Sequence, residues 1–137
     1  MVYGLWHLGC VTSACCSDYM RTIGIDDDKE LIDNLKIGKA PIFEPGLDDL
    51  LQENIASGKL DFKNDKADAL SDCKLLWITF DTPINDDDVA NVDYVLNKIK
   101  KVVSYMQDET ILLISSQLPL GTIKKLKKKI KNKKINF

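Results

Sequence analysis

Residues 2–9 read VYGLWHLG, an apolar segment that runs into a glycine turn. VYGL (2–5) has the character of a buried strand, and a helical pattern follows from about Leu8 to Tyr19. Gly4 and Gly9 have the outer spacing of the G-x-G-x-x-G turn, which presents the amides of a helix N-terminus to a diphosphate. Because Trp6 replaces the middle glycine of that pattern, the turn alone indicates a nucleotide site only weakly.

The same alternation of strand and helix continues along the chain. LLWITF (75–80) is apolar at nearly every position, as a central parallel strand should be. The other expected strands are 22–26, 60–62 (as an edge strand), 111–115 (as a buried strand) and 135–137, with helical patterns between most of them. We therefore expect an α/β fold, a Rossmann-type doubly wound parallel sheet of about six strands with helices on both faces.

Ligands bind such sheets at the carboxyl ends of the strands, where the strand order reverses. This rule places GLWHLG (4–9) and FDTP (80–83) on the same rim of the expected sheet. A ligand that contacts one of these segments should therefore lie close to the other.

Composition excludes several classes of function. The 137 residues suffice for one domain, and a formal net charge of −2 argues against a general nucleic-acid binder. The sequence has no run of about twenty apolar residues, so we predict neither a membrane span nor an export signal. The cysteines lack the spacing of a zinc site, which favours reduced thiols in a cytoplasmic protein. They are Cys10, Cys15, Cys16 and Cys73.

The lysine-rich segment KKLKKKIKNKK (124–134) holds eight lysines. Such a segment attracts acidic partners or lipids, or it forms the solvated face of a helix. Apolar residues at positions 123, 126 and 130 favour the helix.

An acid at the end of the second expected strand strengthens the nucleotide interpretation. Asp26 lies 22 residues after Gly4, where a carboxylate can accept hydrogen bonds from the ribose of adenosine. Asp27 and Asp28 follow it and would repel a 2′-phosphate, which favours NAD over NADP. Two alternatives stay open: the three acids merely cap the next helix, or the cofactor is of the methyltransferase type.

Five segments in order give the chain a family resemblance. They are the glycine turn, GIDDD (24–28), GKAPIFEPGL (38–47), TP (82–83) and SSQLPLGT (115–122). Over essentially all 137 residues, the sequence resembles the N-terminal, NAD-binding domain of the UDP-glucose/GDP-mannose dehydrogenase family. The resemblance implies an NAD-dependent oxidoreductase that oxidises C6 of a nucleotide-activated hexose.

The resemblance also implies roles for particular residues. The amides around Leu5, Trp6, His7 and Leu8 would meet the diphosphate, and Asp26 would hold the adenosine ribose. Thr82 and Pro83 would line the cofactor cleft, with Ser116 beside the nicotinamide. Gln117 stands where the family has a threonine whose hydroxyl is expected to orient a catalytic water, so Gln117 is the catalytic candidate.

The chain departs from the family at Trp6, at Gln117 and at Leu31, where a basic residue is common. The family's catalytic glutamate, lysine, asparagine and cysteine, its dimer-forming helix and its sugar-nucleotide domain belong to later segments. We therefore expect residues 1–137 by themselves to bind NAD without turnover. We expect the whole enzyme to form a homodimer. The alternative is a non-catalytic Rossmann-like module, with an impaired phosphate site, that serves assembly or regulation.

The remaining conspicuous side chains have plainer interpretations. His7, the only histidine, should simply occupy the turn, and Glu44 should fix the start of the helix after it. Asp86–Asp88 lacks the spaced ligands of a calcium site, so no metal is expected. Trp77 lies in the middle of a strand and is expected in the core.

Overall fold

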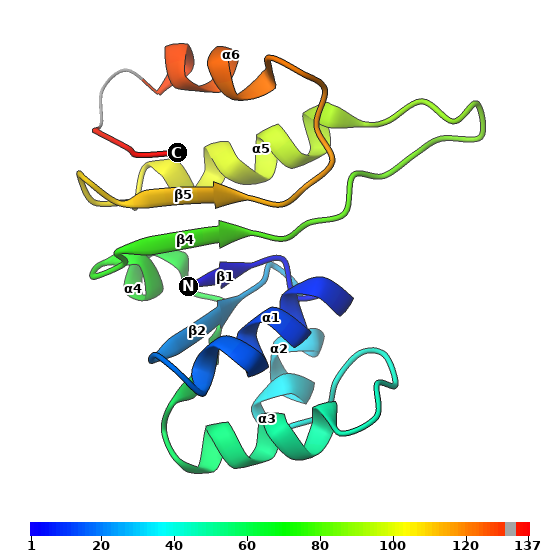
Figure 1. Ribbon diagram of the computed structural model, residues 1–137, viewed down its shortest axis with the longest axis vertical. Helices are drawn as coiled ribbons and strands as arrows, with labels where there is room; N and C mark the ends of the chain where they lie inside the picture. Colours follow the sequence, from blue (N-terminus) through cyan, green and yellow to red (C-terminus); the bar gives the residue numbers. More distant parts are fainter. Residues whose placement is uncertain (131–133) are drawn as a thin grey trace.

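The structure is a computed structural model that describes residues 1–130 and 134–137. One parallel sheet holds the five described strands, in the order β3-β2-β1-β4-β5 (Figure 1). The strands are β1 (Val2–Tyr3), β2 (Thr22–Ile25), β3 (Leu60–Lys63), β4 (Leu75–Ile78) and β5 (Ile111–Ile114). The helices are α1 (His7–Ser17), α2 (Lys29–Lys36), α3 (Leu47–Ala56), α4 (Lys66–Leu70), α5 (Val92–Val103) and α6 (Thr122–Lys129).

The strand order reverses at β1, which pairs with β2 on one side and with β4 on the other. The predicted Rossmann-type fold is therefore confirmed, with β3 as the expected edge strand. Where a sixth strand was expected, the described residues form a single parallel bridge between Ile111 and Asn136. The amide of Leu112 donates to the carbonyl of Asn136 at 2.8 Å, so the segment at the chain's end does lie beside β5.

Two separate apolar cores lie on the two faces of the sheet. Leu5, Ile32 and Leu51 belong to the core beneath α1, α2 and α3. Val95, Ile99 and Leu126 belong to the other core, beneath α4, α5 and α6. Figure 1 shows α1, α2 and α3 grouped around β1 and β2, with α5 and α6 beside β4 and β5. Helices therefore cover both faces, as predicted.

Two expectations about burial were wrong. In β5, Leu112 is buried but Ile111 and Leu113 are 45% and 39% exposed, so only one face of this strand is covered by the described residues. The reason is that α5 and α6 both pack against the face that carries Leu112. Trp77, paired with Leu113 in register, is half-buried rather than part of the core.

The lysine-rich segment forms α6 over part of its length. Leu126 is buried there, and Ile123 and Ile130 are half-buried, while the lysines of the helix are exposed. Residues 131–133 of the segment lie outside the described residues.

Side-chain caps fix where several helices begin. The Asp65 carboxylate accepts hydrogen bonds from the amides of Ala67 and Asp68, at 2.9 and 3.2 Å, at the start of α4. We predict that Asp65→Ala lowers the free energy of unfolding by about 1 kcal/mol, since both amides lose their acceptor. Urea denaturation followed by circular dichroism measures this loss, and an unchanged midpoint would show that water replaces the cap.

Candidate functional site

The turn between β1 and α1 requires glycine at its first position. Gly4 has a φ of +105°, in the region that L side chains rarely adopt, and an added Cβ would lie 2.9 Å from the ring of Phe80. The Gly4 carbonyl accepts a hydrogen bond of 2.7 Å from the hydroxyl of Thr79 at the end of β4. The chain therefore turns tightly at the carboxyl end of β1, directly beside the end of β4.

Helix α1 starts against this turn with its first amides free of side-chain caps. A Cβ on Gly9 would lie 1.9 Å from the carbonyl oxygen of Gly4, so only glycine permits this approach of helix to strand. Trp6 is the N-cap residue, and its side chain makes no capping hydrogen bond in the described structure. Amides in the first turn of a helix have no partner within the helix, and together with the helix dipole they bind anions.

Asp26 comes directly after β2 and reaches across to the turn. It is 8% exposed; one carboxylate oxygen accepts from the amide of Leu5 at 2.8 Å and the other from the amide of Asp28 at 3.0 Å. The acid predicted to hold a ribose is therefore also the group that fastens the glycine turn to β2. Lone pairs remain on both oxygens for hydroxyl donors.

A cleft of about 540 Å³ opens where the strand order reverses. It brings together five of the predicted cofactor residues, namely Gly4, Leu5, Trp6, Asp26 and Pro83. His7, Leu8 and Gly9 do not line it, although they belong to the adjoining first turn of α1. The Trp6 side chain is 53% exposed, so it stands at the edge of the cleft rather than within the core.

The loops after β4 and β5 are joined at the same rim. The Thr82 hydroxyl donates to the carbonyl of Gln117 at 2.7 Å, and the Ser116 hydroxyl donates to the carbonyl of Phe80 at 2.6 Å. The Gln117 side chain is exposed. Thr82, Ser116 and Gln117 thus lie together but outside the cleft itself.

His7 has an acidic neighbour that the sequence did not reveal. Its Nε2 lies 3.0 Å from a carboxylate oxygen of Glu44, and both side chains are about half exposed (51% and 48%). The contact ties the loop of residues 39–46 to the start of α1. The Glu44 carbonyl accepts from the amide of Leu47, the first residue of α3, at 3.0 Å, as expected for a residue at the start of that helix. Its side chain in addition fixes the loop to α1 through His7.

A charged cluster centred on Asp27 was missed by sequence reasoning. Its carboxylate contacts the Nζ atoms of Lys66 and Lys98, the latter at 2.7 Å, and the Tyr3 hydroxyl at 3.3 Å. Burial alone would raise the pKa of Asp27, but the hydrogen bonds from Lys66 and Lys98 outweigh it and hold the pKa well below its usual range. In the sequence, the only indication of this cluster was Lys98, which lies next to the buried apolar residues of α5.

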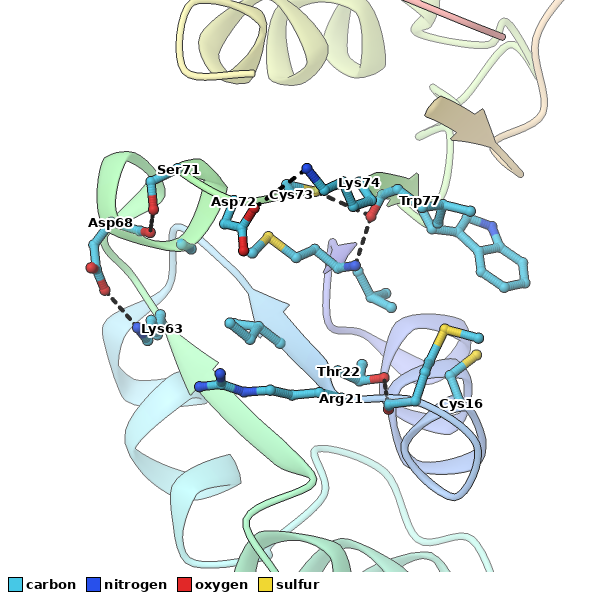
Figure 2. A pocket seen from close by; sticks show the side chains of 16 residues that line it. Cys16, Arg21, Thr22, Lys63, Asp68, Ser71, Asp72, Cys73, Lys74 and Trp77 are labelled. Atoms are coloured by element: carbon cyan, nitrogen blue, oxygen red, sulfur yellow. Dashed lines mark hydrogen bonds and ion pairs between the residues drawn. The ribbon is translucent and has the colours of Figure 1, made fainter. Parts of the chain in front are cut away.

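A second pocket lies at the other end of the strands from the cleft, near their amino ends (Figure 2). Its polar side chains pair with one another: Lys63 with Asp68 at 2.5 Å, and Lys74 with Asp72 at 3.5 Å. It lies at the amino ends of the strands, whereas sheets of this kind bind ligands at the carboxyl ends, at the switch point. The cleft at the carboxyl ends is therefore the candidate functional site.

A sequence model of the UDP-glucose/GDP-mannose dehydrogenase family, describing its NAD binding domain, matches residues 1–137. The chain belongs to this family. The cofactor of the domain is therefore NAD, and the free amides of α1 beside Asp26 are groups that suit its diphosphate and ribose. Among the described residues, no group of three or more side chains could hold a metal ion.

Relatives in the dehydrogenase family are much longer than this chain. The chain is 31% identical to a UDP-glucose 6-dehydrogenase of Bacillus subtilis, over 88% of its own length and 28% of the relative's. It is 33% identical to a GDP-mannose 6-dehydrogenase of Pseudomonas syringae, over 89% and 29% of the two lengths. The chain thus spans less than a third of the length of these curated relatives.

Solved structures of the dehydrogenase family have the same fold. The GDP-mannose dehydrogenase of Pseudomonas aeruginosa superposes with a TM-score of 0.87 at 25% identity, covering 96% of this chain and 32% of that one. A UDP-D-ManNAc dehydrogenase of Pyrococcus horikoshii gives the same TM-score at 27% identity, with the same coverage. In the part of the chain that the structure describes, no helix has the length and apolar character needed to traverse a bilayer.

Proposed function

We propose that residues 1–137 form the NAD-binding domain of a nucleotide-sugar 6-dehydrogenase, an enzyme that oxidises C6 of a UDP- or GDP-linked hexose to the uronic acid. The observation that carries the proposal is the position of the Asp26 carboxylate, which lines the cleft at the switch point and holds the turn that leads into the uncapped first turn of α1. These two features suit two parts of one ligand: the amides suit an anionic diphosphate, and the carboxylate accepts hydrogen bonds from the neutral hydroxyls of a ribose.

Each part of the rim then has a role toward the cofactor. The amides from Trp6 to Leu8 would hold the diphosphate, since the Leu5 amide, also expected there from the sequence, already donates to Asp26. Asp26 would accept the ribose hydroxyls. Thr82, Pro83 and Ser116 would line the path toward the nicotinamide, with Gln117 as the candidate for orienting a water. When bound, NAD supplies the acceptor for the hydride that leaves C6.

Turnover needs groups beyond these residues. Neither buried cysteine is suited to act as a nucleophile on this rim. Burial, with a smaller effect of Asp26, raises the pKa of Cys10 to about 12, which keeps it a thiol. Cys73 precedes β4 and lines the pocket near the amino ends of the strands. We therefore propose that the sugar nucleotide and the catalytic cysteine are held by further segments, as part of a homodimer. The four free cysteines fit a reducing, cytoplasmic compartment.

Trp6 favours a second candidate function. Its half-exposed side chain lines the cleft at the position where the family has a glycine, so it stands beside the expected path of the diphosphate. If the indole closes the phosphate site, the domain is a non-catalytic module that serves assembly or regulation.

Calorimetry with NAD separates the two candidates. We expect the wild-type domain to bind NAD, and Trp6→Gly to bind it several-fold more tightly because the diphosphate can then approach the main chain more closely. The absence of NAD binding by a well-folded wild-type domain would favour the non-catalytic module. Weaker binding by Trp6→Gly would instead show that the indole forms part of the cofactor surface.

A further inference from the structure

An ion pair forms part of the wall of the candidate cleft. Asp27, directly after the proposed ribose acid, and Lys98, from α5, both line the cleft and meet at 2.7 Å. Their side chains are only 27% and 16% exposed. An ion pair this far from bulk water gains little net stability, because the cost of removing its charges from water offsets their attraction. Because the pair nevertheless lines the candidate cleft, its position indicates a role in binding the ligand.

The carboxylate of Asp27 is fixed in place from several sides. Lys66 contacts one of its oxygens, the Tyr3 hydroxyl lies 3.3 Å from both, and Lys101 approaches to 3.7 Å. Asp27 is thus an ionised acceptor whose position is determined by three elements of the fold. A carboxylate has about four lone-pair positions, so one more donor can be accommodated.

Lys98 keeps donor capacity toward the cleft. Its ammonium has three N–H groups, and Asp27 is its one hydrogen-bond acceptor in the described structure. The Nζ atom also lies 5.0 Å from the ring centroid of Phe80 and 5.3 Å from that of Tyr94, and both rings line the cleft. The site therefore combines apolar ring surfaces with an adjacent acceptor and donor.

We propose that Asp27 and Lys98 recognise the Watson–Crick edge of the cofactor's adenine, with Asp27 accepting from the N6 amino group and Lys98 donating to N1. The proposal rests on the proposed function, because it presumes that Asp26 holds the adenosine ribose. The residue after Asp26 is then well placed to reach the base attached to that ribose. Phe80 and Tyr94 supply the apolar surfaces that a purine requires.

Hypoxanthine tests this assignment because it reverses both hydrogen-bonding groups. It carries a carbonyl oxygen in place of the N6 amino group and an N–H at position 1, so it would set acceptor against Asp27 and donor against Lys98. Rotation of the base about the glycosidic bond does not restore the match, because with the ribose held by Asp26 it carries the whole Watson–Crick edge away from the pair. A protein that uses this pair should therefore distinguish NAD from nicotinamide hypoxanthine dinucleotide.

The experiment is calorimetric titration of the wild-type chain with NAD and with nicotinamide hypoxanthine dinucleotide. We expect the hypoxanthine analogue to bind more weakly by a factor on the order of ten or more, as for the loss of hydrogen bonds to charged groups. Lys98→Met should reduce this factor to about threefold or less. Lys101→Met is the matched control: it removes a neighbouring lysine of α5 that also approaches Asp27 but does not line the cleft, and it should keep the full discrimination.

Each outcome is decisive. If the wild-type chain binds NAD and the analogue equally well, or if Lys98→Met keeps the discrimination, Lys98 and Asp27 do not recognise the base, while the proposed function stands. If a folded wild-type chain binds neither dinucleotide, the proposed function itself fails. Should Lys98→Met not fold, equal affinity of the wild-type chain for the two dinucleotides would still overturn the assignment.

Discussion

Gly9→Ala should destabilise the domain by roughly 3 kcal/mol, the largest effect on stability that we expect from a single methyl group. The added Cβ would lie 1.9 Å from the Gly4 carbonyl oxygen and 2.9 Å from the Thr79 hydroxyl. The nearest of these atoms is backbone, so α1 must move away from β1 and disturb the turn that Asp26 holds. Urea denaturation should show a lower midpoint, and calorimetry should show weakened NAD binding by whatever fraction remains folded.

Gly58→Ala provides the matched control. Gly58 has a φ of +72°, but an added Cβ would meet nothing within 4 Å. Its substitution should therefore cost only the strain of a left-handed residue, about 1–2 kcal/mol, with no change in NAD affinity. If Gly9→Ala were no more destabilising than Gly58→Ala, the close packing of α1 on the turn would not be what stabilises this region.

The fold could be predicted because it depends on local patterns. Strands such as β4 are apolar at each position, and the right-handed connections between parallel strands leave few possible topologies. Asp26 could be located for the same reason: its distance from Gly4 along the chain is fixed by one strand–helix–strand unit. The alternative that the acids after β2 cap the next helix also came from residue identity, and Asp28 does accept from the amide of Leu31 at the start of α2.

The Asp27 cluster could not be predicted, because its members are distant in the sequence. Lys98 is 71 residues from Asp27, and neither lies in a motif that suggests the other. Asp27 also repels a 2′-phosphate less than its charge alone predicts, since lysines surround this carboxylate in the structure. Only the packing of α4 and α5 against the end of β2 brings these charges together.

The exposure of β5 shows a second limit of sequence reasoning. Its four residues are all apolar, which predicts burial on both faces, but Ile111 and Leu113 lie on the face that the described helices leave exposed. Apolar character therefore predicts the strand correctly, but it does not predict which other element covers each face.

Asp26→Ala should weaken NAD binding by roughly a hundredfold, the largest effect on affinity that we expect from one side chain. A carboxylate that accepts ribose hydroxyls contributes on the order of 3 kcal/mol through charge-assisted hydrogen bonds. The same substitution leaves the amides of Leu5 and Asp28 without their acceptor, so the turn that presents the diphosphate amides should also loosen. Calorimetry with NAD measures the combined loss. Asp26→Asn keeps the shape of the side chain but removes its charge, so its NAD affinity should fall between those of the wild type and Asp26→Ala.

Asp65→Ala separates loss of affinity from loss of stability. Like Asp26, Asp65 accepts hydrogen bonds from two backbone amides, but it lies outside the cleft. Asp65→Ala should therefore lower stability while leaving NAD affinity within about threefold of wild type, whereas Asp26→Ala should lower both. A folded Asp26→Ala variant that binds NAD as tightly as the wild type would contradict the ribose assignment, because the carboxylate would then serve only to hold the turn.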